Sequence, residues 1–223
     1  MTSLIGLARP RLLDLFCRAG GASMGYHLAG FDVTGVDKGD HSGAYPFTYH
    51  QADAIEFVIE YGREFDVIAG SPPCQLFSQC HRIRRNDHPD LIGPMRDAVL
   101  PLGKPYVIEN VEDARADLRD PVELCGAMFP ELNVYRHRLF ESNVPLFVPV
   151  HPVHVEPQVK MGRPPRPGHR MHVIGNFSGV AAGRVAMGID WMTRDDLREA
   201  IPPAYTHFLG GQVMAALTGQ RAA

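Results

Sequence analysis

Cysteine is scarce in this chain of 223 residues, and no two cysteines form a Cys-x-x-Cys pair. The four are Cys17, Cys74, Cys80 and Cys125. Small disulfide scaffolds and cysteine-based zinc sites both rest on closely spaced cysteines. We therefore expect neither of them and predict no metal site, so the cysteines need another explanation.

Long hydrophobic runs and an excess of basic charge are missing too. No stretch approaches 18 consecutive apolar residues, and the first ten residues lack the charged start and long apolar run of a signal peptide. We expect a cytoplasmic protein with no membrane partner. Lys and Arg number 22 against 25 Asp and Glu, a net charge of −3. Any nucleic-acid partner must therefore be held by local basic patches.

What is present is the composition of a globular domain, with 45% hydrophobic and 21% charged residues. It excludes intrinsic disorder, and the length suits one full-sized core. In the first two thirds, short β-type runs alternate with stretches of helical spacing. The strand candidates are residues 11–16, 31–37, 65–69 and 106–109, and the helix candidates are residues 22–28 and 53–61. This alternation predicts an α/β fold whose mostly parallel sheet has flanking helices.

The composition changes after Glu141. Residues 142–172 are rich in proline, carry four histidines and have one acid, Glu156, against the basic Lys160, Arg163, Arg166 and Arg170. Helix returns near the end, where Thr193 can cap residues 194–200 and Pro202-Pro203 can begin a helix through about Leu217. We therefore expect three parts: residues 1–141, a small basic lobe over 142–187, and residues 188–223 returning to the first part.

A glycine-rich turn follows the first strand candidate. The segment from Asp14 contains Gly20 and Gly21 and opens a helix, where backbone amides can bind the polar end of a ligand. A tight turn that needs positive φ explains the same glycines. Asp37, 23 residues after Asp14, can accept hydrogen bonds from ribose hydroxyls, and Asp53 follows a further short run. Either acid alone is more often a cap or turn residue.

The strongest signal is Pro72-Pro73-Cys74-Gln75, which comes directly after an apolar strand candidate. Two consecutive prolines stiffen a loop and hold the next side chain in place. A thiol presented in this way suggests a nucleophile, and the alternative is a buried packing cysteine.

Two further motifs carry charge. Glu109-Asn110-Val111 ends an apolar strand candidate, where the ligands of open α/β sheets gather and a carboxyl group can move a proton; a helix-capping pair is the alternative. Alternation over residues 135–141 puts Arg136 and Arg138 on one strand face, where two guanidinium groups favour an anion. A pair of surface arginines would look the same.

In this order, the motifs resemble the DNA (cytosine-5)-methyltransferase family. The resemblance covers about residues 11–141 and resumes over 188–217, where Gly188-Ile-Asp-Trp-Met and Ala200 to Gly210 look like the family's closing motifs. It implies a doubly wound, Rossmann-like fold with a minimal recognition lobe, S-adenosylmethionine (SAM) as methyl donor, and double-stranded DNA as substrate. The cofactor-binding residues that it implies are Asp14, Phe16, Gly20, Gly21, Asp37, Asp53, Pro72 and Gly210.

The resemblance also implies the catalytic roles. Cys74 would add as a thiolate to C6 of cytosine, while Glu109, with a raised pKa, would act as the acid at N3. Arg136 and Arg138 would hold the base carbonyl, the thiolate loop or a phosphate. The target base must leave the helix stack to be reached.

The chain departs from the family pattern at several positions. Arg18 stands where the family usually has glycine, Val134 where a glutamine is typical, and Gly211 where an asparagine is common. None of these removes a reacting group. The largest departure is length, since only 46 residues, 142–187, stand where the family places a sizeable recognition domain.

The short lobe contains two HxxH pairs, His151/His154 and His169/His172. Such pairs can bind zinc, but we expect a proline-stiffened basic loop lying on the phosphate backbone. The nucleic-acid-binding candidates are Arg82, Arg84, Arg85, Lys160, Arg163, Arg166 and Arg170. The alternatives to DNA cytosine methylation are tRNA cytosine-5 methylation and a catalytically silent protein that binds SAM or DNA. A partner protein that completes recognition is compatible with the small lobe.

Overall fold

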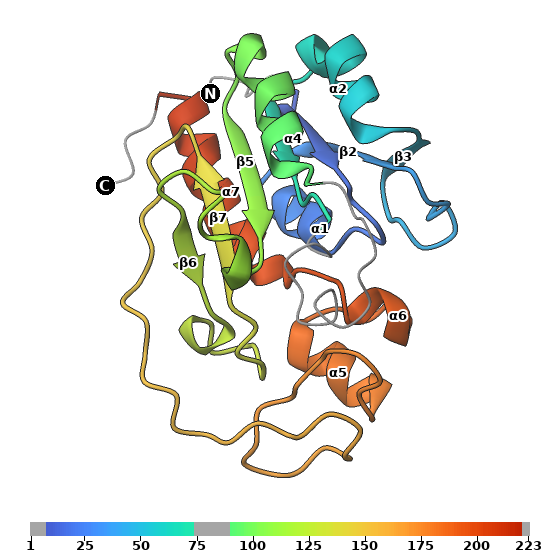
Figure 1. Ribbon diagram of the computed structural model, residues 1–223, viewed down its shortest axis with the longest axis vertical. Coiled ribbons are helices and arrows are strands. Elements are labelled where there is room, and N and C mark those ends of the chain that lie inside the picture. The colour runs from blue at the N-terminus through green and yellow to red at the C-terminus, as the bar shows by residue number, and fades with distance from the viewer. Residues whose placement is uncertain (1–7, 74–89, 220–223) are drawn as a thin grey trace, which may run out of the picture.

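The centre of the molecule is a seven-stranded sheet, seen in a computed structural model that describes residues 8–73 and 90–219. The strand order is β3-β2-β1-β4-β5-β7-β6 (Figure 1). Strands β1 to β5 run parallel, whereas β7 is antiparallel to both β5 and β6. The strands are β1 Arg11–Leu15, β2 Asp32–Asp37, β3 Thr48–Gln51, β4 Val67–Gly70, β5 Tyr106–Asn110, β6 Val122–Leu124 and β7 Arg138–Ser142. The predicted doubly wound, mostly parallel sheet is confirmed.

The helices connect and cover these strands. The α-helices are α1 Gly21–Leu28, α2 Ala54–Tyr61, α4 Ile92–Val99, α5 Val180–Met187, α6 Arg194–Leu197 and α7 Pro203–Leu217. Short 3-10 turns occupy η1 Gly62–Glu64, η3 Leu100–Leu102, η4 Glu112–Ala114 and η5 Gly126–Met128. Within the described part of the chain, no helix has the length and apolar character needed to cross a membrane.

The two faces of the sheet bury two separate layers of side chains, because successive strand residues point to opposite faces. On β1, Leu12 packs into the layer that contains Tyr205 of α7. Its neighbour Leu13 packs into the opposite layer with Val58 of α2 and Met95 of α4. The sheet is therefore covered on both faces, as parallel sheets generally are.

The C-terminal helix α7 packs closely on α1. A Cβ atom added at Gly25 would lie 2.2 Å from the carbonyl oxygen of Pro203, so only glycine allows this approach. The Thr206 hydroxyl donates to the carbonyl of Ala22 at 2.8 Å. Residues near 200, far along the chain, thus lie beside the turn that follows β1.

Two sequence-based expectations are wrong in detail. Arg136 and Arg138 do not share a strand face, because β7 begins at Arg138 and Arg136 has a φ of 37°. The helix capped by Thr193 ends at Leu197 rather than at residue 200, although the cap itself forms, with Asp196 completing a capping box.

Candidate active site

A cavity of about 530 Å³ opens at the carboxyl ends of the parallel strands. The strand order reverses between β1 and β4, and such a switch point is where open α/β sheets bind ligands. Eight of the predicted site residues line it: Asp14, Phe16, Gly21, Asp37, Asp53, Pro72, Glu109 and Arg138. The volume falls in the usual range of small-molecule sites, about 300–1,000 Å³.

Asp14 is the most deeply buried carboxyl group of the cavity, at 1% exposure. It accepts a hydrogen bond from the Ser23 hydroxyl, which itself accepts one from Tyr45 at 2.8 Å. Burial raises the pKa of Asp14 to about 7, and the nearby carboxylates of Glu109 and Asp37 add to the rise. Asp14 therefore ties the end of β1 to helix α1 from within the core.

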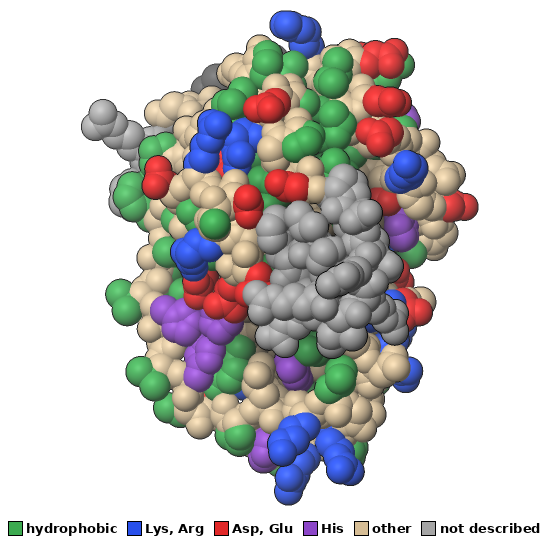
Figure 2. Space-filling view, in the orientation of Figure 1, with side chains coloured by type: hydrophobic (Ala, Val, Ile, Leu, Met, Phe, Trp, Pro, Cys, Tyr) green, Lys and Arg blue, Asp and Glu red, His purple; other side chains and the backbone are tan. Residues whose placement is uncertain are grey.

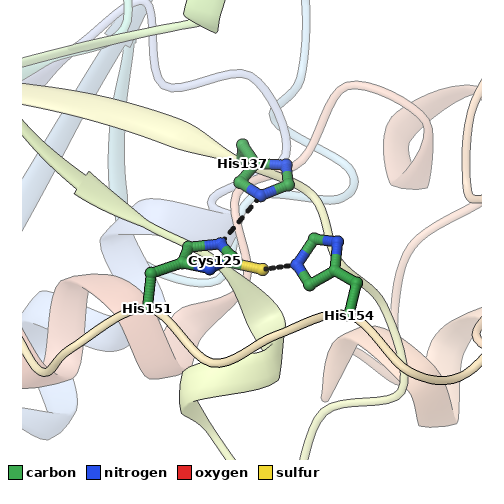
Figure 3. Close-up of side chains that lie close together, drawn as sticks. All are labelled: Cys125, His137, His151 and His154. Carbon is green, nitrogen blue, oxygen red and sulfur yellow. Dashed lines mark hydrogen bonds between the residues drawn. The ribbon is translucent and has the colours of Figure 1, made fainter.

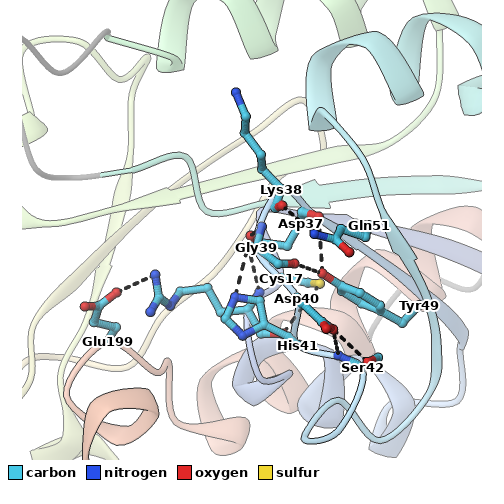
Figure 4. A network of polar contacts seen from close by, with 11 residues as sticks. Cys17, Asp37, Lys38, Gly39, Asp40, His41, Ser42, Tyr49, Gln51 and Glu199 are labelled. Atoms are coloured by element: carbon cyan, nitrogen blue, oxygen red, sulfur yellow. Dashed lines mark hydrogen bonds and ion pairs between the residues drawn. The ribbon is translucent and has the colours of Figure 1, made fainter.

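Asp37, at the end of β2, organises the loops at the rim (Figure 4). One carboxylate oxygen accepts from the backbone N–H of Arg18 at 3.1 Å, and the other from that of Gly39 at 2.9 Å. A carboxylate has about four acceptor positions, so two backbone donors leave capacity for the hydroxyls of a ligand. Asp37 can thus hold the loops at the rim in place and, at the same time, accept hydrogen bonds from a ligand.

Asp53 caps helix α2 and lines the cavity as well. One of its carboxylate oxygens accepts from the backbone N–H groups of Ile55 and Glu56 at 2.9 and 3.2 Å. The predicted position of Asp53 at a helix N-terminus is confirmed. The cap bonds hold this carboxyl group in a fixed place at the rim.

Arg18 adopts a φ of 46°, in the left-handed region. Glycine enters this region most readily, which explains why glycine suits this position. Its guanidinium forms an ion pair with Glu199 at 2.7 Å, which joins the turn after β1 to the segment before α7. Both residues line the cavity. The side chain thus closes one wall of the cavity through a contact with a residue far along the sequence.

A side chain at the end of β5 holds the start of the loop that leads to Cys74. The Asn110 side-chain amide donates to the carbonyl of Pro72 at 3.1 Å, and its oxygen accepts from the Val111 N–H at 2.9 Å. Asn110 is buried at 1% exposure, so this clamp lies in the core. Cys74 itself, with Arg82, Arg84 and Arg85, lies outside the described residues.

Glu109 faces Arg138 in the cavity wall. The Arg138 Nε lies 3.0 Å from Glu109 Oε1, yet this oxygen has no hydrogen bond with a described residue, so the contact is an ion pair of poor angle. Burial raises the pKa of Glu109, although the charges of Arg138 and Arg136 and a hydrogen bond with Ser71 oppose the rise. Glu109 is thus a buried carboxyl group of raised pKa in the cavity wall, in contact with the Arg138 guanidinium.

In a second buried carboxyl group, that of Glu141, the pKa is lowered rather than raised. Burial alone would raise the pKa of Glu141, but hydrogen bonds from Arg96, from the Arg119 backbone and from Tyr106 lower it. Arg96 donates to both oxygens, at 2.7 and 2.6 Å. Both oxygens of Glu141 are therefore held by hydrogen bonds, whereas one oxygen of Glu109 has an ion pair with Arg138 but no hydrogen bond to a described residue.

Among the described residues predicted to act in catalysis or cofactor binding, three do not line this cavity. The Arg136 guanidinium donates to the carbonyls of Ala200, Val173 and Arg198 at 2.7 to 2.9 Å, so it joins three chain segments. A Cβ atom at Gly210 would lie 2.8 Å from that of Ala29, which makes it a packing glycine between α7 and α1. Gly20, with a φ of 80°, caps α1.

The basic candidates within residues 142–187 differ in their surroundings. Lys160, Arg163 and Arg166 are exposed, and Figure 2 shows Lys and Arg side chains gathered at the lower end of the molecule. Arg170 instead donates to the Leu132 carbonyl at 2.6 Å and forms an ion pair with Glu156 at 3.4 Å. The guanidinium of Arg170 is thus bound to groups of the protein itself.

Comparison with known proteins supports a methyltransferase relationship. Residues 10–90 match the model of C-5 cytosine-specific DNA methylases. Type II methyltransferase M.XorII of Xanthomonas oryzae pv. oryzae is 30% identical over 123 residues, which is 48% of this chain and 29% of that protein. Type II methyltransferase M.AquIA of a Picosynechococcus species is 28% identical over 123 residues, 46% of this chain and 48% of that protein. The matches thus span less than half the length of either relative.

One solved structure has the same fold over nearly the whole chain. It is a candidate DNA modification methyltransferase encoded within a prophage of E. coli, 15% identical, with a TM-score of 0.64. The match covers 94% of this chain and 99% of that one. The two proteins therefore share a Rossmann-like α/β fold.

Proposed function

We propose that this chain is a SAM-dependent methyltransferase that acts on C5 of cytosine in DNA. The observation that carries the proposal is Glu109, a buried carboxyl group with a raised pKa that stands beside the Arg138 guanidinium in the cavity wall. It lines the same cavity as Asp37 and the Pro72-Pro73 turn that leads to Cys74. The match to the cytosine methylase model supports this assignment.

The cavity suits SAM in size and donor set. The backbone at Gly21 and the carboxyl groups of Asp37 and Asp53 would hold its polar parts, while Phe16 and Ile201 supply apolar wall. When bound, SAM supplies an electrophilic methyl group and leaves as S-adenosylhomocysteine. Among the described residues, neither rim carboxylate forms an ion pair with a Lys or Arg, so both can bind hydroxyl or amino groups of a ligand.

The chain's own groups would activate the base. C5 of cytosine is a weak nucleophile. Addition of the Cys74 thiolate to C6 would turn C5 into an enamine carbon, which is a stronger nucleophile. Glu109 would donate a proton or hydrogen bond at N3 as charge builds there. Once C5 has taken the methyl group from SAM, its proton would pass to water, and elimination of Cys74 would restore the aromatic ring. Arg138, next to Glu109, would stabilise the base carbonyl or the thiolate, and Arg136 would position the segments around it.

The proposal is tested by incubating the protein with methyl-labelled SAM and either duplex DNA or tRNA, followed by nucleoside analysis. We expect labelled 5-methylcytosine in DNA. Label in tRNA alone would favour the tRNA alternative. No label in either, with SAM still bound, would leave a catalytically silent protein and contradict the proposal.

Replacing Asp37 with alanine is expected to weaken SAM binding at least about tenfold, the effect of losing a charged hydrogen bond of about 1.5–3 kcal/mol. Calorimetry with SAM measures this effect. Asp40→Ala is the matched control, because the Asp40 carboxylate accepts hydrogen bonds from Ser42 and does not line the cavity. Equal dissociation constants for the two variants would refute the role of Asp37.

DNA binding is expected to depend on the exposed basic residues of the lobe. Each phosphate contact contributes about −0.9 to the slope of log affinity against log salt, so replacing Lys160, Arg163 and Arg166 by alanine should flatten the slope by up to about 2.7. Binding should weaken for all sequences alike. Arg63→Ala, in η1 before β4, is the control and should leave the slope unchanged. A changed set of methylated sites with normal affinity would instead show that the lobe reads bases.

A further inference from the structure

Four side chains with metal-binding atoms gather at the edge of the sheet, outside the cavity described above. They are Cys125, His137, His151 and His154, and their sulfur and ring nitrogens all lie within 4.8 Å of one another (Figure 3). The Cys125 Sγ lies 3.2 Å from His154 Nε2, and the Nε2 atoms of His137 and His151 lie 3.0 Å apart. The four donors therefore point to a common centre.

The fold brings the first two together through strand register. Leu124, the last residue of β6, pairs with Arg138, the first of β7, so the next residues outward, Cys125 and His137, lie opposite each other. The N–H of Gly126 donates to the Tyr135 carbonyl at 2.6 Å and continues this pairing. The two ligands thus sit on paired backbone that fixes their separation.

The other two ligands come from a segment that little else holds. Residues 144–156 make no backbone-to-backbone hydrogen bond within the described chain. The apolar side chains between and beside the histidines face solvent, with Val150 at 93% and Val153 at 84% exposure. The ends are tied, since Phe147 bonds with Gln212 and the Glu156 carbonyl accepts from Tyr135. Between these ties, Val148 packs against the core, and the histidines contact Cys125, His137 and Tyr135 near the edge of the sheet.

We propose that these residues form a structural zinc site with one cysteine and three histidine ligands. Zinc–nitrogen and zinc–sulfur bonds of about 2.0–2.1 and 2.3 Å at tetrahedral angles place ligand atoms roughly 3.3–3.6 Å apart. The two pairs at 3.2 and 3.0 Å are slightly closer than this, and all four donor atoms lie within 4.8 Å of one another, so side-chain adjustments of about 1 Å would bring them to zinc-binding separations. Four protein ligands close the coordination shell, as in structural rather than catalytic zinc sites.

The surroundings of the ligands fit a metal. The backbone N–H of Ala127 donates to Cys125 Sγ at 3.4 Å, a contact that stabilises thiolate charge. On the other side of the His137 ring, Nδ1 lies 3.5 Å from a carboxylate oxygen of Glu112, which leaves Nε2 for the metal. Figure 2 shows histidine side chains gathered beside acidic ones on this face.

The site would fasten the start of the basic lobe to the sheet next to the candidate active site. His137 stands directly before Arg138, and the Arg138 guanidinium donates to the His137 carbonyl at 2.7 Å. A metal bound to His137 therefore steadies the backbone that carries Arg138. This role does not depend on the chemistry proposed for the larger cavity.

The test is metal analysis of the purified full-length protein after dialysis, with cobalt substitution as a second measurement. We expect one zinc per chain, and on cobalt loading the visible bands of tetrahedral Co²⁺ with a sulfur-to-cobalt charge-transfer band. His154→Ala should lose the metal without disturbing the core, because His154 is exposed. Cys125→Ser should abolish the charge-transfer band. His169→Ala, from the other HxxH pair, is the matched control and should bind metal like the wild type.

Two results would overturn the proposal. One is a wild-type protein that binds no more zinc than His154→Ala when supplied with one equivalent. The other is a cobalt spectrum that Cys125→Ser leaves unchanged, which would mean adventitious binding to surface histidines. A chelator should also lower the melting temperature of the wild type and of His169→Ala, but not that of His154→Ala, since a ligand that binds only the folded state stabilises it.

Discussion

Replacing Cys74 with alanine is expected to abolish methyl transfer while leaving SAM binding intact. Deleting a catalytic nucleophile costs on the order of 10⁴-fold or more in rate, because the whole covalent route is lost. The thiol acts only once cytosine has arrived, so its removal should not affect the cofactor cavity. Methyl transfer assays give the rate, and calorimetry gives the SAM dissociation constant.

Cys80→Ala is the matched control for this prediction, since it removes a thiol from the same stretch of chain. We expect it to keep wild-type activity. If both variants lose activity equally, the segment is sensitive to any change. If Cys74→Ala turns over at the wild-type rate, the covalent mechanism is wrong.

Glu109→Gln is expected to lower the methyl transfer rate by about 10²–10⁴-fold, the usual contribution of a positioned general acid. Glutamine preserves the shape of the side chain and can donate a hydrogen bond, but it has no proton to transfer. The loss should appear in kcat rather than in the SAM dissociation constant.

The direction of the Glu109 pKa shift predicts how the effect of this substitution changes with pH. Burial raises the Glu109 pKa above its usual 4.5, so the protonated form persists to higher pH than in an exposed glutamate. As pH rises through that raised pKa, wild-type Glu109 loses its proton, whereas the amide of the E109Q variant does not titrate. The ratio of wild-type to E109Q rates should therefore fall with rising pH, and effects of thiol ionisation cancel in this ratio.

Glu141→Gln is the control, because Glu141 is also buried but is bound by Arg96, Tyr106 and the Arg119 backbone. This change should lower the free energy of unfolding and leave the pH dependence of the wild-type to variant rate ratio flat. A rate ratio for E109Q that is independent of pH would show that Glu109 does not act through its proton.

The parts of the fold that could be predicted from sequence are those encoded by local pattern. The runs that form β1, β2, β4 and β5 are apolar and end in polar or glycine-rich motifs, so strand and turn are visible together. Helix α4 is not predicted, because Gly93 and Pro94 lie in its first turn and are typical of a loop. Strand β6 has only three residues, too few to show a period.

The site was predictable where chemistry follows a strand and not where distant segments meet. Asp14, Asp37 and Glu109 all lie near the ends of strands in one parallel sheet, so their convergence follows from that sheet. The contacts of Arg136 are with carbonyls 37 to 64 positions away, which no local pattern encodes. Its left-handed backbone, which breaks the alternation with Arg138, accompanies those contacts.

The cluster of Cys125, His137, His151 and His154 likewise could not be predicted from local sequence pattern. The HxxH spacing of His151 and His154 is visible in the sequence, but two histidines are only half a zinc site. Cys125 and His137 complete the set only through the antiparallel register of β6 and β7. Cys125 has no cysteine near it in the sequence, and its three histidine neighbours meet it only in the fold, so a pattern of paired cysteines does not identify it as a metal ligand.

The most direct test of the central claim is a covalent trap with duplex DNA that contains 5-fluorocytosine. Fluorine at C5 cannot leave as a proton does, so an adduct formed by attack at C6 and methyl transfer to C5 cannot resolve. With SAM present, we predict a protein–DNA band that survives denaturing electrophoresis, is absent with Cys74→Ala, and carries the methyl label. No band with the wild type, or a band that persists in Cys74→Ala, would contradict the account.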